Sequence, residues 1–115
     1  MEEVDIKFDG KIISRARYCS SLFSKTKGLM FSKKLKKGKS VILVSDFGPR
    51  FGSAIGMLFV FFPLDVVFLN KNKEVVDVRK AYPFLSHIVP KKNSKYVIEM
   101  NKGENKLRMG DKVSF

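Results

Sequence analysis

The acidic residues that could carry chemistry are few, and two of them lie within apolar runs. Asp65 follows Phe-Pro-Leu in the run FFPLDVVFL, and Glu99 lies between Ile98 and Met100. Two neighbouring carboxylates can act as general acid and base, so a paired-carboxylate site is one hypothesis. Strand alternation would aim Glu99 away from the face of its two neighbours. For Asp65 we favour a carboxylate whose oxygens tie the Phe62-Pro63 bend or an adjacent loop; the alternative is a ligand-binding carboxylate.

A nucleophilic set is a second hypothesis, built from Cys19, His87 and Asp65. The chain has one cysteine and one histidine, and triads are recognised by geometry rather than by spacing. No nucleophile motif accompanies Cys19, so a buried thiol and a surface imidazole are the favoured interpretation. One cysteine excludes an internal disulfide, and the two residues are too few for a structural zinc site. We therefore predict no catalytic residue, no metal and no cofactor, and an enzyme is the least favoured class.

Lysines dominate the segment from Lys25 to Lys39, which contains no acidic residue. The whole chain has 23 Lys plus Arg against 11 Asp plus Glu, a formal net charge of +12. Such a charge attracts anions over a Debye length of about 10 Å at moderate salt. An anion-contact loop for nucleic acid or an acidic protein is one hypothesis, and a solvated surface that keeps the protein soluble is the alternative. The candidate contact residues are Lys33, Lys34, Lys36, Lys37 and Lys39.

The elements that must position these residues are mostly short strands. Asp9-Gly10 between alternating apolar residues predicts a hairpin, and Ser40–Ser45 predicts a strand covered on both faces. Serine caps, lysines and a following glycine predict one short helix near Ser21–Lys27. Other strands are predicted over 57–62, 65–69, 74–80, 95–100 and after the turn at 110–111, with a polar turn at Asn70–Lys73 before the strand at 74–80. The predicted fold is all-β with one short helix, an antiparallel sandwich, jelly-roll or barrel-like roll in a single domain over residues 1–115.

The most apolar stretch, IGMLFVFFPLDVVFL over residues 55–69, is not predicted to insert into a membrane. It is shorter than the about 20 residues that a spanning helix needs, and it contains Pro63 and Asp65. No charged start followed by an apolar run occurs at the beginning of the sequence, which indicates no secretory signal. We expect a cytoplasmic protein.

Several short motifs occur here in a characteristic order. They are GLMF at 28–31, FPLDVVFL at 62–69, YVIE at 96–99, a glycine at 103 and GDKV at 110–113. The ordered set, spanning Ala16 to Phe115, resembles the family known as domain of unknown function 192, found in bacteria and archaea. The resemblance implies a compact β-rich fold of jelly-roll or sandwich type, and it implies no agreed activity, cofactor or substrate. Many members carry a tryptophan-methionine or a histidine before the Pro-Leu-Asp step, whereas this chain has the apolar GMLFVF.

The function predicted from the sequence is binding rather than catalysis. We expect a small non-enzymatic module with a ligand or partner site near the Pro63–Asp65 bend. The ligand-binding candidates are Asp65, Met30, Phe31 and Glu99. The alternative is a basic module that binds nucleic acid or an acidic partner through the Lys33–Lys39 loop.

Overall fold

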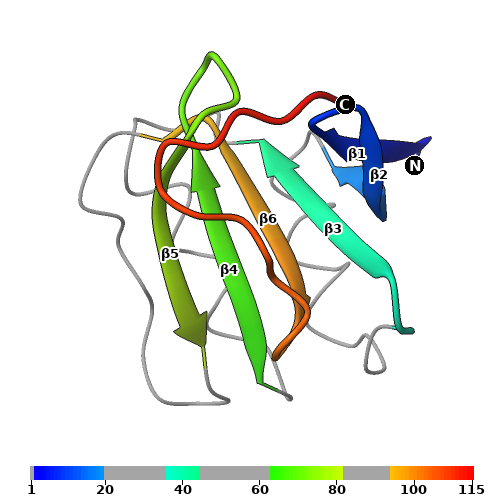
Figure 1. The fold of residues 1–115 in the computed structure, drawn as a ribbon. Helices are drawn as coiled ribbons and strands as arrows, with labels where there is room; N and C mark the ends of the chain where they lie inside the picture. The colour runs from blue at the N-terminus through cyan, green and yellow to red at the C-terminus, as the bar shows by residue number, and fades with distance from the viewer. Residues whose placement is uncertain (1, 20–35, 45–62, 82–93) are drawn as a thin grey trace.

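The computed structural model describes residues 2–19, 36–44, 63–81 and 94–115 (Figure 1). The regular elements of this part are all strands, which confirms the all-β prediction. They are β1 (Glu2–Phe8), β2 (Lys11–Cys19), β3 (Lys39–Val44), β4 (Leu64–Leu69), β5 (Val75–Ala81) and β6 (Tyr96–Asn101). The helix predicted near Ser21–Lys27 and the strand predicted over 57–62 lie outside the described residues.

The six strands form one sheet in the order β1-β2-β3-β6-β4-β5. Its pairs are antiparallel except for β2 and β3, which run parallel from Arg15 beside Lys39 to Cys19 beside Leu43. The sheet is therefore mixed rather than purely antiparallel. A parallel pair requires a crossover connection, and the chain places residues 20–38 between these two strands.

Local turn chemistry formed two of the predicted connections. Asp9 and Gly10 both have positive φ, 52° and 78°, as a two-residue hairpin turn that matches the strand twist requires. Between β4 and β5, the Asn70 carbonyl accepts the Lys73 N–H at 2.9 Å, and Lys73 has a φ of 64°. The Asn70 side-chain oxygen also accepts the Glu74 N–H at 3.0 Å, so both the main chain and the side chain of Asn70 hold the turn.

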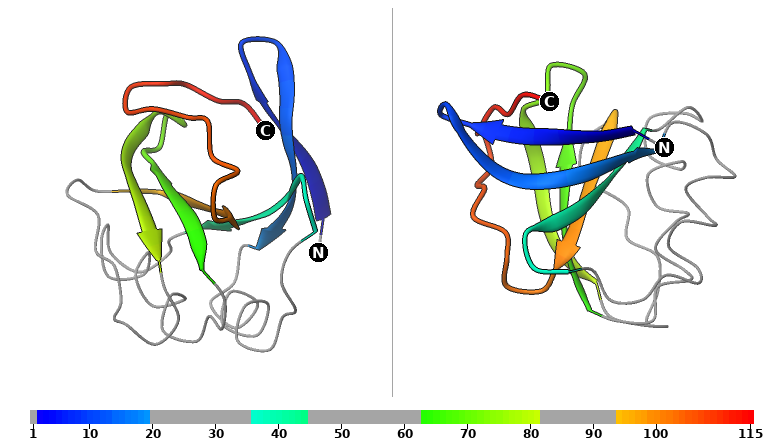
Figure 2. Two further views of the ribbon diagram at one scale, coloured as in Figure 1. Left: turned by 60° about the horizontal axis from the view of Figure 1, so that its bottom comes forward. Right: turned by 90° about the vertical axis from the view of Figure 1, so that its right-hand side faces the viewer.

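The C-terminal segment links the two edges of the sheet (Figure 2). At the β5 edge the Val113 N–H donates to the Lys73 carbonyl at 3.0 Å, and the Gly110 N–H donates to the Val75 carbonyl at 2.9 Å. At the β1 edge Lys7 and Ser114 exchange both main-chain hydrogen bonds, at 2.8 and 2.9 Å. The last predicted strand is thus a pair of isolated bridges, Glu74 with Lys112 and Lys7 with Ser114, which join the two edges of the sheet in a barrel-like roll.

Alternation along the strands gives the sheet two buried faces. The interior face carries the main apolar cluster, formed by Ile6, Ala16, Ile42, Val67, Leu69, Val75, Ile98, Met100, Leu107 and Val113. The opposite face of the three central strands is also buried. We call it the second face, and it consists of Val41, Leu43, Leu64, Val66, Phe68, Val97 and Glu99. Burial on both sides agrees with the continuous apolar run predicted for β3 and extends it to β4.

Candidate functional site

Asp65 is the second residue of β4, lies on the interior face and ties that strand to the loop after β6. Its Oδ2 accepts the N–H groups of Gly103 at 2.9 Å and Asn105 at 3.1 Å. Gly103 has a φ of 90°, a conformation open to glycine that lets the loop turn back over the strand. The side chain is buried, and Oδ1 has no hydrogen-bond partner among the described residues. The hydrogen bonds of this carboxylate thus join β4 to a loop 38 and 40 residues further along the chain.

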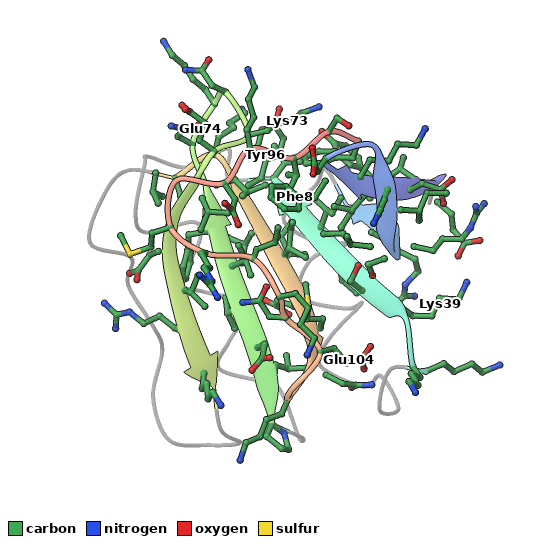
Figure 3. All side chains as sticks on the ribbon, viewed as in Figure 1. Phe8, Lys39, Lys73, Glu74, Tyr96 and Glu104 are labelled. Carbon is green, nitrogen blue, oxygen red and sulfur yellow. The ribbon has the colours of Figure 1, made fainter. Side chains whose placement is uncertain are left out.

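Hollows lined by described residues occur at the other end of the sheet from Asp65. Two shallow hollows of about 400 and 230 Å³ share Val4 and Phe115. Beside them, Lys73 Nζ donates to the Phe115 main-chain oxygen at 2.9 Å and lies 4.0 Å from the centre of its ring. Tyr96 packs edge-on against the same ring at 5.1 Å, near Lys73 in Figure 3. These contacts anchor the C-terminal segment. The ammonium group of Lys73, which lines the smaller hollow, is therefore already hydrogen-bonded.

Glu99 is the most unusual polar side chain in the described part of the chain. It lies in the middle of β6, between Val41 of β3 and Val66 of β4, and it has no solvent exposure. Neither carboxylate oxygen has a hydrogen-bond partner among the described residues. Burial disfavours the charged form and raises the pKa of Glu99 to about 8. At neutral pH the group is therefore mainly a neutral carboxyl, which carries an O–H donor and a carbonyl acceptor.

The structure does not bring the two candidate carboxylates together. Glu99 pairs with Val66, and Asp65 is the residue before Val66 in β4. Because successive side chains of a strand point to opposite faces, the Asp65 side chain lies on the other face of the sheet from Glu99. The partner of Asp65 across the strands is Met100, on the interior face. The described geometry gives no support to a paired-carboxylate site.

Two arginines flank Glu99 along a row of paired residues that crosses the sheet. On one side Val41 pairs with Arg17 of β2, and on the other side Val66 pairs with Arg79 of β5. The Arg79 Nε is 3.0 Å from Oδ2 of the buried Asp77, whereas Arg17 makes no ion pair with a described residue. This row could not be predicted from the sequence, because it follows from strand order and register. Glu99 itself was identified through its apolar flanks.

The described lysines of the predicted anion-contact loop form a turn just before β3. The Lys39 N–H donates to the Lys36 carbonyl at 3.0 Å, and the Gly38 N–H donates to Glu104 Oε1 at 2.8 Å. Figure 3 shows Lys39 and Glu104 at the same end of the sheet. Lys39 Nζ is also 3.7 Å from Glu3 Oε1.

Six other candidates predicted from the sequence lie outside the residues and side chains that the structure describes. These are the side chain of Cys19, which ends β2, and the residues Met30, Phe31, Lys33, Lys34 and His87. Within the described ranges, no group of three or more His, Cys, Asp or Glu residues is arranged to hold a metal ion. The same part of the chain contains no helix long and apolar enough to cross a membrane.

Comparison with known proteins places the chain in a group without an assigned activity. The family domain of unknown function 192, described as an uncharacterised ACR, matches residues 4–115. A UPF0127 protein of Pyrococcus abyssi is 33% identical over 117 residues, covering 99% of this chain and 93% of the relative. A UPF0127 protein of Thermococcus sibiricus is 34% identical over 94 residues, covering 81% of this chain and 59% of that protein.

Solved structures confirm the fold at lower sequence identity. A crystal structure of a protein of unknown function from Novosphingobium aromaticivorans has a TM-score of 0.78 at 22% identity, covering 98% of this chain and 85% of that chain. A Sinorhizobium meliloti protein, named as a candidate transcription regulator, has a TM-score of 0.83 at 16% identity, covering 98% of this chain and 93% of that chain. By its sequence match over nearly the whole length, this chain belongs to the domain of unknown function 192 family.

Proposed function

We propose that this chain is a non-enzymatic module that binds a small, mainly apolar molecule against the second face, with Glu99 as its polar recognition group. The observation that carries the proposal is a fully buried carboxyl without a hydrogen-bond partner in the described part of the chain. Leaving such a group unsatisfied costs roughly 1–3 kcal/mol or more, so native proteins rarely keep one without a purpose. A ligand that hydrogen-bonds to Glu99 would remove that cost on binding.

The surroundings of Glu99 define the chemistry of the ligand. Its cross-strand neighbours are Val41 and Val66, and the rest of the second face is apolar, so the body of the ligand would be apolar. A neutral carboxyl pairs best with a hydroxyl, carbonyl or amide head group. A cationic head would need ionised Glu99 and would approach a chain of net charge +12 with Arg17 and Arg79 at the flanks.

Binding is favoured over catalysis because no second titratable side chain lies next to Glu99 on the described strands. Its partners across β3 and β4 are valines, and Asp65 leaves the other side of the sheet. A ligand site beside Asp65 itself has less support, since one of its oxygens already accepts two loop N–H groups. The site proposed here therefore keeps Glu99 from the predicted residues and gives Asp65 a structural role.

Native mass spectrometry of freshly purified protein tests the proposal. We expect a mass increment of a small molecule that is released on denaturation and then identified as a mainly apolar compound. The variant Glu99→Met, which has a similar size but no strong hydrogen-bond donor or acceptor, should retain at most a tenth of that occupancy. The matched control Asp9→Asn removes an exposed carboxylate at a position of positive φ that asparagine tolerates, and it should retain full occupancy.

The pH dependence of binding tests the ligand chemistry separately. Because the proposed ligand prefers protonated Glu99, its affinity should fall about tenfold per pH unit above pH 8, the folded-state pKa of the group. Equal occupancy in the wild type and Glu99→Met would refute the role of Glu99. An affinity that rises with pH would instead indicate a cationic ligand and overturn the neutral head group.

A further inference from the structure

One end of the sheet gathers lysines from segments that are far apart in the sequence. We call it the lysine end, and it consists of Lys36, Lys37, Lys39, Lys80, Lys102 and Lys106. Figure 1 shows β3 and β4 starting and β5 and β6 ending at this end, where the loop after β6 also lies. The described contacts join these segments, because Glu104 holds Gly38 and Asp65 holds both Gly103 and Asn105. Lys80, near the end of β5, pairs with Asp65 of β4, so the end of β5 also lies at the lysine end.

The acidic groups of this end already have other roles. Asp65 is buried and accepts two main-chain N–H groups, and Glu104 accepts the Gly38 N–H. Glu3 lies between Lys39 and Arg15, at 3.7 Å from each. Lys36, Lys37, Lys80 and Lys106 are exposed and make no ion pair with a described residue. The lysine end is therefore a surface of strongly positive potential rather than a balanced network.

We infer that the lysine end binds the phosphate backbone of nucleic acid without reading its sequence. Lysine ammonium groups on exposed loops contact phosphate oxygens as point charges, and such contacts carry no base information. The net charge of +12 adds long-range attraction for a polyanion. This inference does not depend on a ligand at Glu99, which lies on the second face.

The composition of the lysine end favours nucleic acid over an acidic protein or a membrane. Protein interfaces are anchored by buried aromatic or apolar residues, and membrane-surface binding needs an apolar face. The exposed large apolar residues in the described part are Ile12, Ile13 and Met109. Ile12 and Ile13 lie in β2, and Met109 lies where the C-terminal segment has reached the start of β5, because the next residue, Gly110, donates to Val75. The lysine end therefore presents positive charge without an exposed large apolar residue among the described residues, which suits contacts to a phosphate backbone.

Fluorescence anisotropy with a short labelled DNA duplex, using the full 115-residue chain, measures the predicted electrostatics. The logarithm of the association constant should fall linearly with the logarithm of salt concentration, by about 0.9 for each phosphate neutralised. With four to six lysines in contact, we expect a slope of about −4 to −5. Duplexes of different base composition should bind equally within a factor of about three, because the contacts are to phosphates.

A matched pair of variants separates the lysine end from the overall charge. Lys80→Gln with Lys106→Gln should lower the steepness of the salt dependence by about 2 and weaken binding at least tenfold at low salt. The control, Lys11→Gln with Lys71→Gln, removes the same charge from an exposed residue next to one turn and an exposed residue within another, at the other end of the strands, and should leave the slope unchanged. Lys36→Gln with Lys37→Gln should reduce the salt slope and the affinity as much as Lys80→Gln with Lys106→Gln, because both pairs of lysines lie on the lysine end.

Three outcomes would overturn the inference. The first is absence of DNA binding at low salt, and the second is an equal loss in the test and control variants. The third is tighter binding of an acidic polypeptide such as polyglutamate than of duplex DNA at equal charge concentration, which would assign the lysine end to an acidic protein partner.

Discussion

The replacement Glu99→Gln should make the protein more stable, and the gain should grow with pH. In the folded protein the buried carboxyl keeps its proton up to a pKa of about 8, whereas the unfolded value is 4.5. Between these values folding takes up a proton, so stability contributed by Glu99 is complete below the unfolded pKa and is lost as pH rises through the folded pKa. Glutamine has a similar shape but cannot ionise, so the stability of the variant does not fall in this way as pH rises.

The size of the effect follows from the two pKa values. Each pKa unit corresponds to about 1.4 kcal/mol, so the shift from 4.5 to about 8 gives a difference of about 5 kcal/mol at alkaline pH. At neutral pH the difference should be about 3 kcal/mol, and near the unfolded pKa it should approach zero. These values are comparable with the whole stability of a small domain, about 5–15 kcal/mol.

Urea unfolding of the wild type and Glu99→Gln over a pH series measures this difference directly. Other titrating groups contribute equally to both proteins, so the difference curve isolates Glu99. Asp9→Asn is the control, because it removes an exposed carboxylate and should give a curve parallel to the wild type. A difference between wild type and Glu99→Gln that stays flat within about 1 kcal/mol across the series would refute the reasoning, since it would mean that Glu99 is solvated or paired in solution.

Two further substitutions test the polar contacts that hold the roll together. Asp65→Ala removes the acceptor of the Gly103 and Asn105 N–H groups and should lower the free energy of unfolding by about 3 kcal/mol in urea titration; a loss below about 1 kcal/mol would contradict the structural tie. Ser14→Ala removes the buried 2.7 Å hydrogen bond to Ser40 and should cost about 1–2 kcal/mol in the same measurement, whereas unchanged stability would show that the hydroxyl pair contributes nothing net.

Much of the local structure could be predicted from short stretches of sequence. The hairpin at Asp9-Gly10 and the turn at Asn70–Lys73 depend on the backbone preferences of a few residues, and the structure has both. The strand at Ser40–Ser45 could be predicted in the same way, because β-branched residues in a continuous apolar run favour a strand buried on two faces. The last predicted strand formed only isolated bridges, since its bonds go to two different edges of the sheet.

The arrangement of the candidate sites was decided by tertiary structure. The sequence places Asp65 and Glu99 each in a strand, but only the register between β4 and β6 sends them to opposite faces. Strand order likewise brings Lys80 and Lys106 to the end occupied by Lys36, although the sequence indicated only the lysine loop. Strand formation and alternation depend on neighbouring residues, whereas pairing and register depend on how all the apolar faces are buried at once. The sequence alone therefore determined the all-β elements and the family, and the fold determined which charged groups meet.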